Sequence, residues 1–226
     1  KYYLSSDSEE FFVKLEELFF DYETVIASNS LEECEQILEK YAILAPNSNS
    51  LRPFLNELKN HNPDFVKGSI TGPFTFSTSI VDNVVKCAYY NDVLRDVCTK
   101  TLSLKALWQV LEFKKASPKA RAVIFMDEPS ISQVGSCAFL SVESKDVIEM
   151  LKVITGALAK FGALSGIHCC GKTDWEIALS CGADIVNFDA YFYAQSVANF
   201  ASTAQKFVEQ GGYLAFGIVP KLDREI

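Results

Sequence analysis

Short apolar runs alternate with longer amphipathic segments along most of the chain. The runs end in polar residues, glycine or proline, and their lengths and flanks are typical of buried parallel strands. The pattern predicts six strands, at Tyr41–Ala45, Val66–Thr71, Ala122–Met126, Leu164–Cys169, Asp184–Phe188 and Tyr213–Ile218.

The segments between these runs place apolar residues at helical spacing. They predict helices over Ser8–Phe20, Leu31–Lys40, Asp92–Phe113, Lys145–Phe161 and Val197–Gln210. Ser30 precedes the second helix and Glu33 follows three residues later, which is the spacing of a capping box. Strand–helix alternation of this kind predicts a parallel sheet covered by helices.

Two α/β architectures fit this alternation, an open doubly wound sheet and a closed (β/α)8 TIM barrel. No G-x-G-x-x-G or P-loop motif is present, which argues against the nucleotide-binding forms of the open sheet. Conspicuous polar residues end several of the predicted strands, where barrel enzymes place their active sites. The barrel is therefore favoured. A complete barrel has eight strands and about 250 residues, so we expect residues 1–226 to form one barrel domain without its first and last units.

Composition narrows the classes of partner. The chain has 226 residues, 49% of them hydrophobic, and 21 Lys and Arg against 29 Asp and Glu give a net charge of −8. Without a basic run, nucleic acids and anionic membranes are poor partners, and no apolar stretch reaches the roughly 18 to 20 residues of a membrane span. Seven cysteines, an odd number in a chain of this length, indicate reduced thiols in a cytoplasmic protein.

The sharpest chemical feature is His168-Cys169-Cys170, at the end of a predicted strand. Alternate side chains of a strand share a face, so His168 and Cys170 point the same way and Cys169 points oppositely. An imidazole and a thiolate are ligands that suit Zn²⁺, and Asp189 at the end of the next strand is a candidate third ligand. The alternatives are a structural core histidine beside buried thiols, and an aspartate that caps a helix.

Other strand ends carry further candidates. Asp127 and Glu128 follow a buried strand, where two carboxylates can anchor a cationic substrate group, act as acid and base, or hold arginine and backbone N–H groups. Thr71 and Gly72 offer a hydroxyl and close backbone approach to a ligand, or form an ordinary turn. Tyr191 is either a wall of the substrate pocket or a core aromatic residue.

Taken in order, these motifs resemble the catalytic barrel of cobalamin-independent methionine synthase and its wider superfamily, which includes uroporphyrinogen decarboxylase and corrinoid-linked methyltransferases. The matching pieces span Val66 to Pro220 and are Gly72-Pro73-Phe74-Thr75, Met126-Asp127-Glu128-Pro129, His168-Cys169-Cys170, Asp189 and Gly217-Ile218-Val219-Pro220. The resemblance implies a (β/α)8 barrel with zinc held by His168, Cys170 and Asp189. It also implies that Asp127 and Glu128 hold an amino-acid substrate.

The chain departs from the methionine synthase pattern at two places. The synthases carry glutamate where this chain has Asp189. After the last matching strand they carry an Asp-His-Ser-Pro segment and a further zinc-binding cysteine, whereas this chain has Ile218-Val219-Pro220-Lys221.

The resulting hypothesis is a zinc-dependent methyltransferase that transfers a methyl group to a zinc-activated thiol, as in methionine biosynthesis. The donor is left open among a folate, a corrinoid protein and another methylated compound, and a homodimer is left open as well. One alternative is a metal-free enzyme like uroporphyrinogen decarboxylase, with Asp127 or Asp189 as its working carboxylate. The other is a non-catalytic barrel that binds a small molecule.

Overall fold

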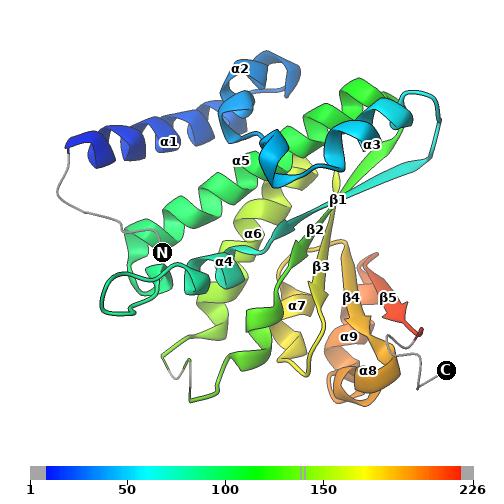
Figure 1. Cartoon of the computed structure of the whole chain (residues 1–226). Helices are drawn as coiled ribbons and strands as arrows, with labels where there is room; N and C mark the ends of the chain where they lie inside the picture. Colours follow the sequence, from blue (N-terminus) through cyan, green and yellow to red (C-terminus); the bar gives the residue numbers. More distant parts are fainter. Residues whose placement is uncertain (1–8, 138, 140, 220–226) are drawn as a thin grey trace.

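A sheet of five parallel strands forms the centre of the part of the chain that the structure describes (Figure 1). The structure is a computed structural model, and it describes residues 9–137, 139 and 141–219. Each strand pairs with the next strand along the chain, in the order β1-β2-β3-β4-β5. The strands are β1 (Phe65–Thr71), β2 (Arg121–Asp127), β3 (Leu164–Cys169), β4 (Ile185–Asp189) and β5 (Tyr213–Gly217). The predicted α/β class with a parallel sheet is thus confirmed.

Helices precede the sheet and connect its strands. The α-helices are α1 (Glu9–Ala27), α2 (Glu35–Leu38), α3 (Leu51–Leu58), α4 (Pro73–Ser79), α5 (Asp92–Ala116), α6 (Ser144–Lys160), α7 (Trp175–Ser180), α8 (Ala190–Ala198) and α9 (Ala201–Glu209). Short 3-10 helices are η1 (Glu32–Cys34), η2 (Glu39–Tyr41), η3 (Ala45–Asn47), η4 (Ala88–Tyr90) and η5 (Pro129–Gln133). No helix in the described part has both the length and the apolar character needed to cross a membrane.

The connecting helices form one layer. Helix α5 contacts β1 and β2, and it also contacts α6, which in turn contacts β3 and α7. Helix α7 contacts α9, which contacts β5. Connections between parallel strands are almost always right-handed, and in a sheet of sequential strand order this brings the connecting helices to one face, which accounts for this chain of contacts. Helices α1, α2 and α3 contact α5 and build a second layer above it (Figure 1).

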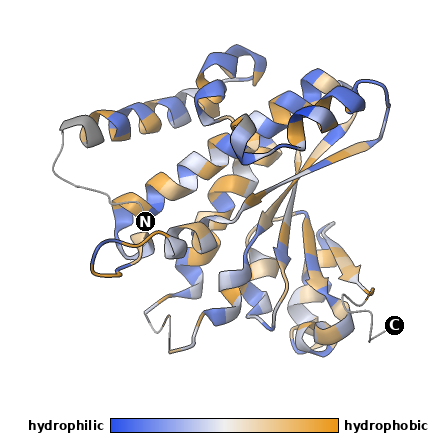
Figure 2. Ribbon diagram, viewed as in Figure 1, coloured by the Kyte–Doolittle hydropathy of each residue, from blue (hydrophilic) through white to orange (hydrophobic). Residues whose placement is uncertain are grey.

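The two faces of the sheet differ in chemistry. The face toward the helices is apolar and buried, with Val66, Ile70, Ile124, Met126, Ile167, Cys169, Val186 and Phe188. On the opposite face of β1, Lys67, Ser69 and Thr71 are at least partly exposed. Apolar and hydrophilic residues likewise alternate along α1 and α5, whose apolar sides supply the packing of the helical layers (Figure 2).

The predicted strand at Tyr41–Ala45 is wrong. Helix η2 ends at Tyr41 and η3 begins at Ala45, and the run packs against the core as irregular backbone. Lys105 of α5 donates from Nζ to the carbonyl oxygens of Tyr41 and Ala42, at 3.0 and 3.4 Å. These side-chain hydrogen bonds satisfy carbonyls that a strand would pair with a neighbouring strand. An apolar run of this length does not by itself distinguish a strand from a buried loop.

The other five strands lie where they were predicted, but the helices differ in extent. The first helix continues past Phe20 to Ala27. The predicted helix Leu31–Lys40 is divided into η1, α2 and η2, and Ser30 Oγ accepts from Glu32 N instead of closing a capping box with Glu33. The predicted helix Val197–Gln210 is α9 together with the end of α8, and the two helices are separated at 199–200.

Candidate active site

A row of polar side chains crosses the sheet at the carboxyl ends of four strands. In the strand register Thr71 pairs with Asp127, Asp127 with His168, and His168 with Asn187. Residues paired in register lie on the same face, and neighbouring strands are about 4.8 Å apart. Thr71 is exposed and the other three are half-buried, so the row is open to a ligand. The sequence prediction included three members of this row and missed Asn187.

His168 is anchored through one ring nitrogen. Its Nδ1 lies 2.6 Å from Oδ1 of Asn187, and the amide Nδ2 of Asn187 donates to the carbonyl oxygen of Ala215 on β5 at 2.9 Å. The imidazole is thus tied through β4 to β5. Asn187 stands two residues before Asp189 on the same strand, so the strand period of two puts both on one face, and this signal could have found Asn187.

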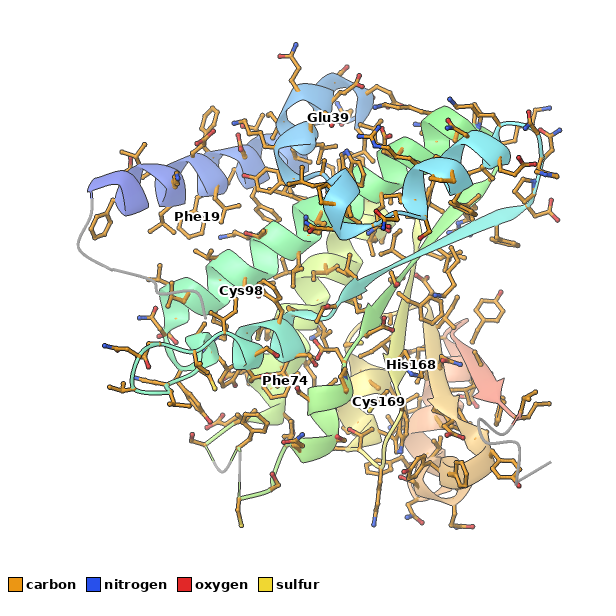
Figure 3. The ribbon with its side chains drawn as sticks, viewed as in Figure 1. Phe19, Glu39, Phe74, Cys98, His168 and Cys169 are labelled. Atoms are coloured by element: carbon orange, nitrogen blue, oxygen red, sulfur yellow. The ribbon has the colours of Figure 1, made fainter. Side chains whose placement is uncertain are left out.

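The cysteines beside His168 lie in different environments. Cys169 is 1% exposed and faces the helices, and burial raises the pKa of its thiol. Cys170 follows the last residue of β3 and is exposed. The expected opposite orientation of His168 and Cys169 agrees with their burial, and Figure 3 shows both residues near the carboxyl end of β3. All seven cysteines lie in the described part of the chain and are free thiols.

Asp189 acts as the N-cap of α8. Its Oδ1 accepts from the backbone N–H of Phe192 at 3.2 Å, which satisfies one of the donors that a helix start leaves unpaired. Of the two interpretations from the sequence, helix cap and metal ligand, the cap is the role visible in this structure. Tyr191 stands on the first turn of the same helix, is 47% exposed and packs edge-on against Phe192. A ring with this exposure is not a core aromatic residue.

Glu128 has no exposed surface. Its carboxylate accepts from the backbone N–H groups of Phe74 and Thr75, both at 2.9 Å, and from the Thr75 hydroxyl at 2.6 Å. Burial, with a smaller contribution from the nearby charge of Asp127, raises its pKa to about 7 against the lowering effect of these hydrogen bonds. A buried carboxylate held in this way positions the start of α4 and is closed to solvent, whereas Asp127 keeps exposed surface.

Gly72 is required by Glu128. It is buried at the N-cap of α4, and a Cβ built on it would overlap Oε1, Cδ and Cγ of Glu128. The close backbone approach expected for Gly72 is therefore made to a side chain of the protein. Thr71, one residue earlier, remains exposed in the polar row.

The donors expected to hold zinc fit that metal in part. His168 and Cys170 are a nitrogen and a sulfur donor, half-buried and exposed, two residues apart. Asp189 is engaged as a cap, and no group of three His, Cys, Asp or Glu side chains that could hold a metal ion occurs in the described residues. His168 and Cys170 are thus two accessible donors, and no third donor joins them among the described residues.

Comparisons were made with protein-family models, with curated proteins and with solved structures. None of the three found a match to this chain. The resemblance to the methionine synthase barrel therefore rests on the motifs at the strand ends and on their order along the chain.

Proposed function

We propose that this chain carries the active site of a zinc-dependent methyltransferase whose acceptor is a thiol, with His168 and Cys170 as protein ligands of the metal. The observation that carries the proposal is the placement of His168. Its Nδ1 is engaged by Asn187, its Nε2 makes no hydrogen bond to any described residue, and an exposed thiol follows two residues later. Histidines that bind metals are commonly anchored through the other ring nitrogen in this way.

Zinc bound there would supply one kind of chemistry, since it lowers the pKa of a coordinated thiol and keeps the sulfur as a thiolate. In the reaction the acceptor sulfur forms a bond to the methyl carbon while the bond from that carbon to the donor breaks. The donor group leaves with the electron pair. Asp127, half-buried and paired with His168 in the strand register, would bind a cationic group of the acceptor. Glu128 and Gly72 position α4 beneath the site.

We also infer that the five strands are consecutive strands of a (β/α)8 barrel. The sequential strand order and the single layer of connecting helices support this inference, because a doubly wound sheet reverses its order and carries helices on both faces. The face opposite the helices would then be the barrel interior. Phe125 already fills part of it by lying over Gly166, where an added Cβ would come within 2.6 Å of the ring. Seven free thiols suit the reducing cytoplasm.

The proposal is tested by the zinc content of protein purified without a chelator or a histidine tag. We expect zinc near one per chain in the wild type, and loss of that zinc in His168→Ala and in Cys170→Ser. Cys137→Ser is the matched control. Cys137 is also an exposed loop thiol, but it does not lie at the carboxyl end of any strand that carries the polar row. Equal metal content in all four proteins, or none in the wild type, would refute the zinc site.

A metal-free acid–base enzyme is the second candidate, and one observation favours it. Asp127 and His168 pair in register at the open edge of the site, while no third metal donor joins His168 and Cys170 in the described residues. Aspartate and histidine are common general acids and bases. This candidate predicts that Asp127→Asn abolishes turnover, while Cys170→Ser leaves turnover unchanged. The zinc candidate predicts that Cys170→Ser abolishes it.

A further inference from the structure

Asn187 is a polar side chain inside the sheet with two hydrogen-bonding partners of different kinds. It lies on β4 between His168 of β3 and Ala215 of β5 and is half-buried. One partner is an imidazole nitrogen at 2.6 Å and the other is a backbone carbonyl oxygen at 2.9 Å. The carbonyl can only accept, and this asymmetry determines how the remaining groups are protonated.

The orientation of the amide follows from Ala215. Since the Ala215 carbonyl requires a donor, Nδ2 of Asn187 faces β5 and Oδ1 faces β3. Oδ1 is an acceptor only, so the contact with His168 is a hydrogen bond only if Nδ1 of the ring carries the proton. In the neutral ring Nε2 then holds the lone pair. A neutral imidazole in water prefers the other arrangement, with the proton on Nε2.

We propose that Asn187 is the positioning residue of this site, which holds His168 in the Nδ1–H tautomer and thereby presents Nε2 as the donor atom to the metal. The metal part of this inference rests on the proposed function, whereas the tautomer does not. Asn187 does so without adding a charge beside the ring. A carboxylate at the same position would also accept from Nδ1, but it would leave the Ala215 carbonyl without its donor and face it with a negative charge.

A purely structural role for Asn187 predicts something different. Asn187 also joins β3, β4 and β5, so its loss will loosen the sheet whatever it does for His168. Ser165 offers a comparison, because its hydroxyl donates to Asp184 Oδ2 at 2.9 Å where the β3 and β4 segments begin. Ser165→Ala therefore weakens the same strand pair without touching the imidazole. A change in the His168 tautomer that follows the loss of Asn187 but not Ser165→Ala would show that Asn187 positions the ring, since both changes loosen the sheet.

The test is nitrogen NMR of the imidazole rings in ¹⁵N-labelled, metal-free protein at a pH of about 8.5, about two units above the ordinary pKa of a histidine side chain. The chain has two histidines, and His61→Gln identifies the signals of His168. We expect a protonated Nδ1 in the wild type, in Ser165→Ala and in Asn187→Asp. We expect a shift of the proton toward Nε2 in Asn187→Leu. Zinc added to the same proteins should bind about 10–100-fold more weakly to Asn187→Leu than to the wild type.

The outcomes test three points separately, namely the tautomer of His168, the zinc site and the specific role of Asn187. A wild-type ring with its proton on Nε2 overturns the inference without any variant, and so does an unchanged tautomer in folded Asn187→Leu. If Asn187→Leu does not fold, the inference is tested by the tautomer of His168 in the wild type and in Asn187→Asp, where it requires the proton on Nδ1. Protonated Nδ1 together with absent zinc binding in the wild type upholds the tautomer and refutes the zinc proposal. Equal weakening of zinc binding by Ser165→Ala and Asn187→Leu refutes the specific role of Asn187.

Discussion

Replacing Gly72 with alanine tests the anchor beneath the site. Gly72 has φ −68° and ψ 157°, a conformation that alanine adopts without strain, so the backbone itself does not require glycine here. The requirement comes from Glu128, whose Oε1, Cδ and Cγ occupy the space of the new Cβ. To admit the methyl group, either the carboxylate leaves the start of α4 or the backbone of Gly72 moves and weakens its hydrogen bond to Asp127 O.

The expected cost follows from the contacts that would be lost. The Glu128 carboxylate accepts three hydrogen bonds, two from backbone N–H groups and one from the Thr75 hydroxyl. Above pH 7 the carboxylate is charged, and hydrogen bonds to a charged group each contribute about 1.5–3 kcal/mol, so losing two of them destabilises by about 3–6 kcal/mol. A glycine-to-alanine change at a tolerated position raises the unfolding free energy by about 0.4–1 kcal/mol, because alanine lowers the conformational entropy of the unfolded chain. The net loss of unfolding free energy for Gly72→Ala is therefore about 2–5.6 kcal/mol.

The assay is urea unfolding, followed by the fluorescence of the two tryptophans, Trp108 and Trp175, both of which are buried. In a Glu128→Ala background the obstructing atoms are absent, and Gly72→Ala should then be neutral or stabilising by about 0.5 kcal/mol. Gly156→Ala is the control. Gly156 lies within α6, and no neighbouring group comes within 4 Å of the position that an added methyl group would take, so the change should stabilise by about 1 kcal/mol. Equal effects of Gly72→Ala in both backgrounds would refute the reasoning.

Three further outcomes are expected. Because burial raises the pKa of Glu128 from 4.5 to about 7, the folded state binds its proton more tightly than the unfolded state, and stability is lost as the pH rises through that range. The unfolding free energy of Glu128→Gln relative to the wild type should therefore rise by about 3 kcal/mol between pH 4.5 and 8, and a flat difference contradicts the assignment. Val85 is 74% exposed with φ 66°, so Val85→Gly should relieve strain and raise the unfolding free energy by about 1 kcal/mol, whereas a loss would indicate unseen packing. Asn91 caps α5 by accepting from Leu94 N at 3.0 Å, and Asn91→Ala should lower the melting temperature with a cost of about 1 kcal/mol.

Local pattern was sufficient for most of the secondary structure. Five of the predicted strands are present. Each is an apolar run that ends at a turn, and because the face toward the helices is buried, these runs are clearly apolar in the sequence. The run at Tyr41–Ala45 carries the same local signal but no neighbouring strand to pair with. Its carbonyls at Tyr41 and Ala42 are satisfied by Lys105, a residue more than sixty positions away along the chain.

In the candidate site, too, some features follow from the local sequence and others depend on tertiary contacts. Placement of Asp127 and His168 at the carboxyl ends of strands follows from the sequence, because the strand ends themselves are local features. The position of Glu128 does not, since its partners lie 53 and 54 residues earlier and reach it only when the start of α4 meets the residue that follows β2. The local pattern of Asp127-Glu128 treats the two carboxylates alike, although one is half-buried at the site and the other is fully enclosed.

The sequence by itself determined the α/β class, the alternation of strands and helices, and the residues that stand at the strand ends. Only the tertiary structure decided which of those residues meet, because register and packing join positions that no local period relates. Asn187 and His168 are 19 residues apart and become neighbours through the pairing of β3 with β4. Burial is a property of whatever packs above a side chain, and hydrogen-bond partners across strands exist only once the sheet has formed.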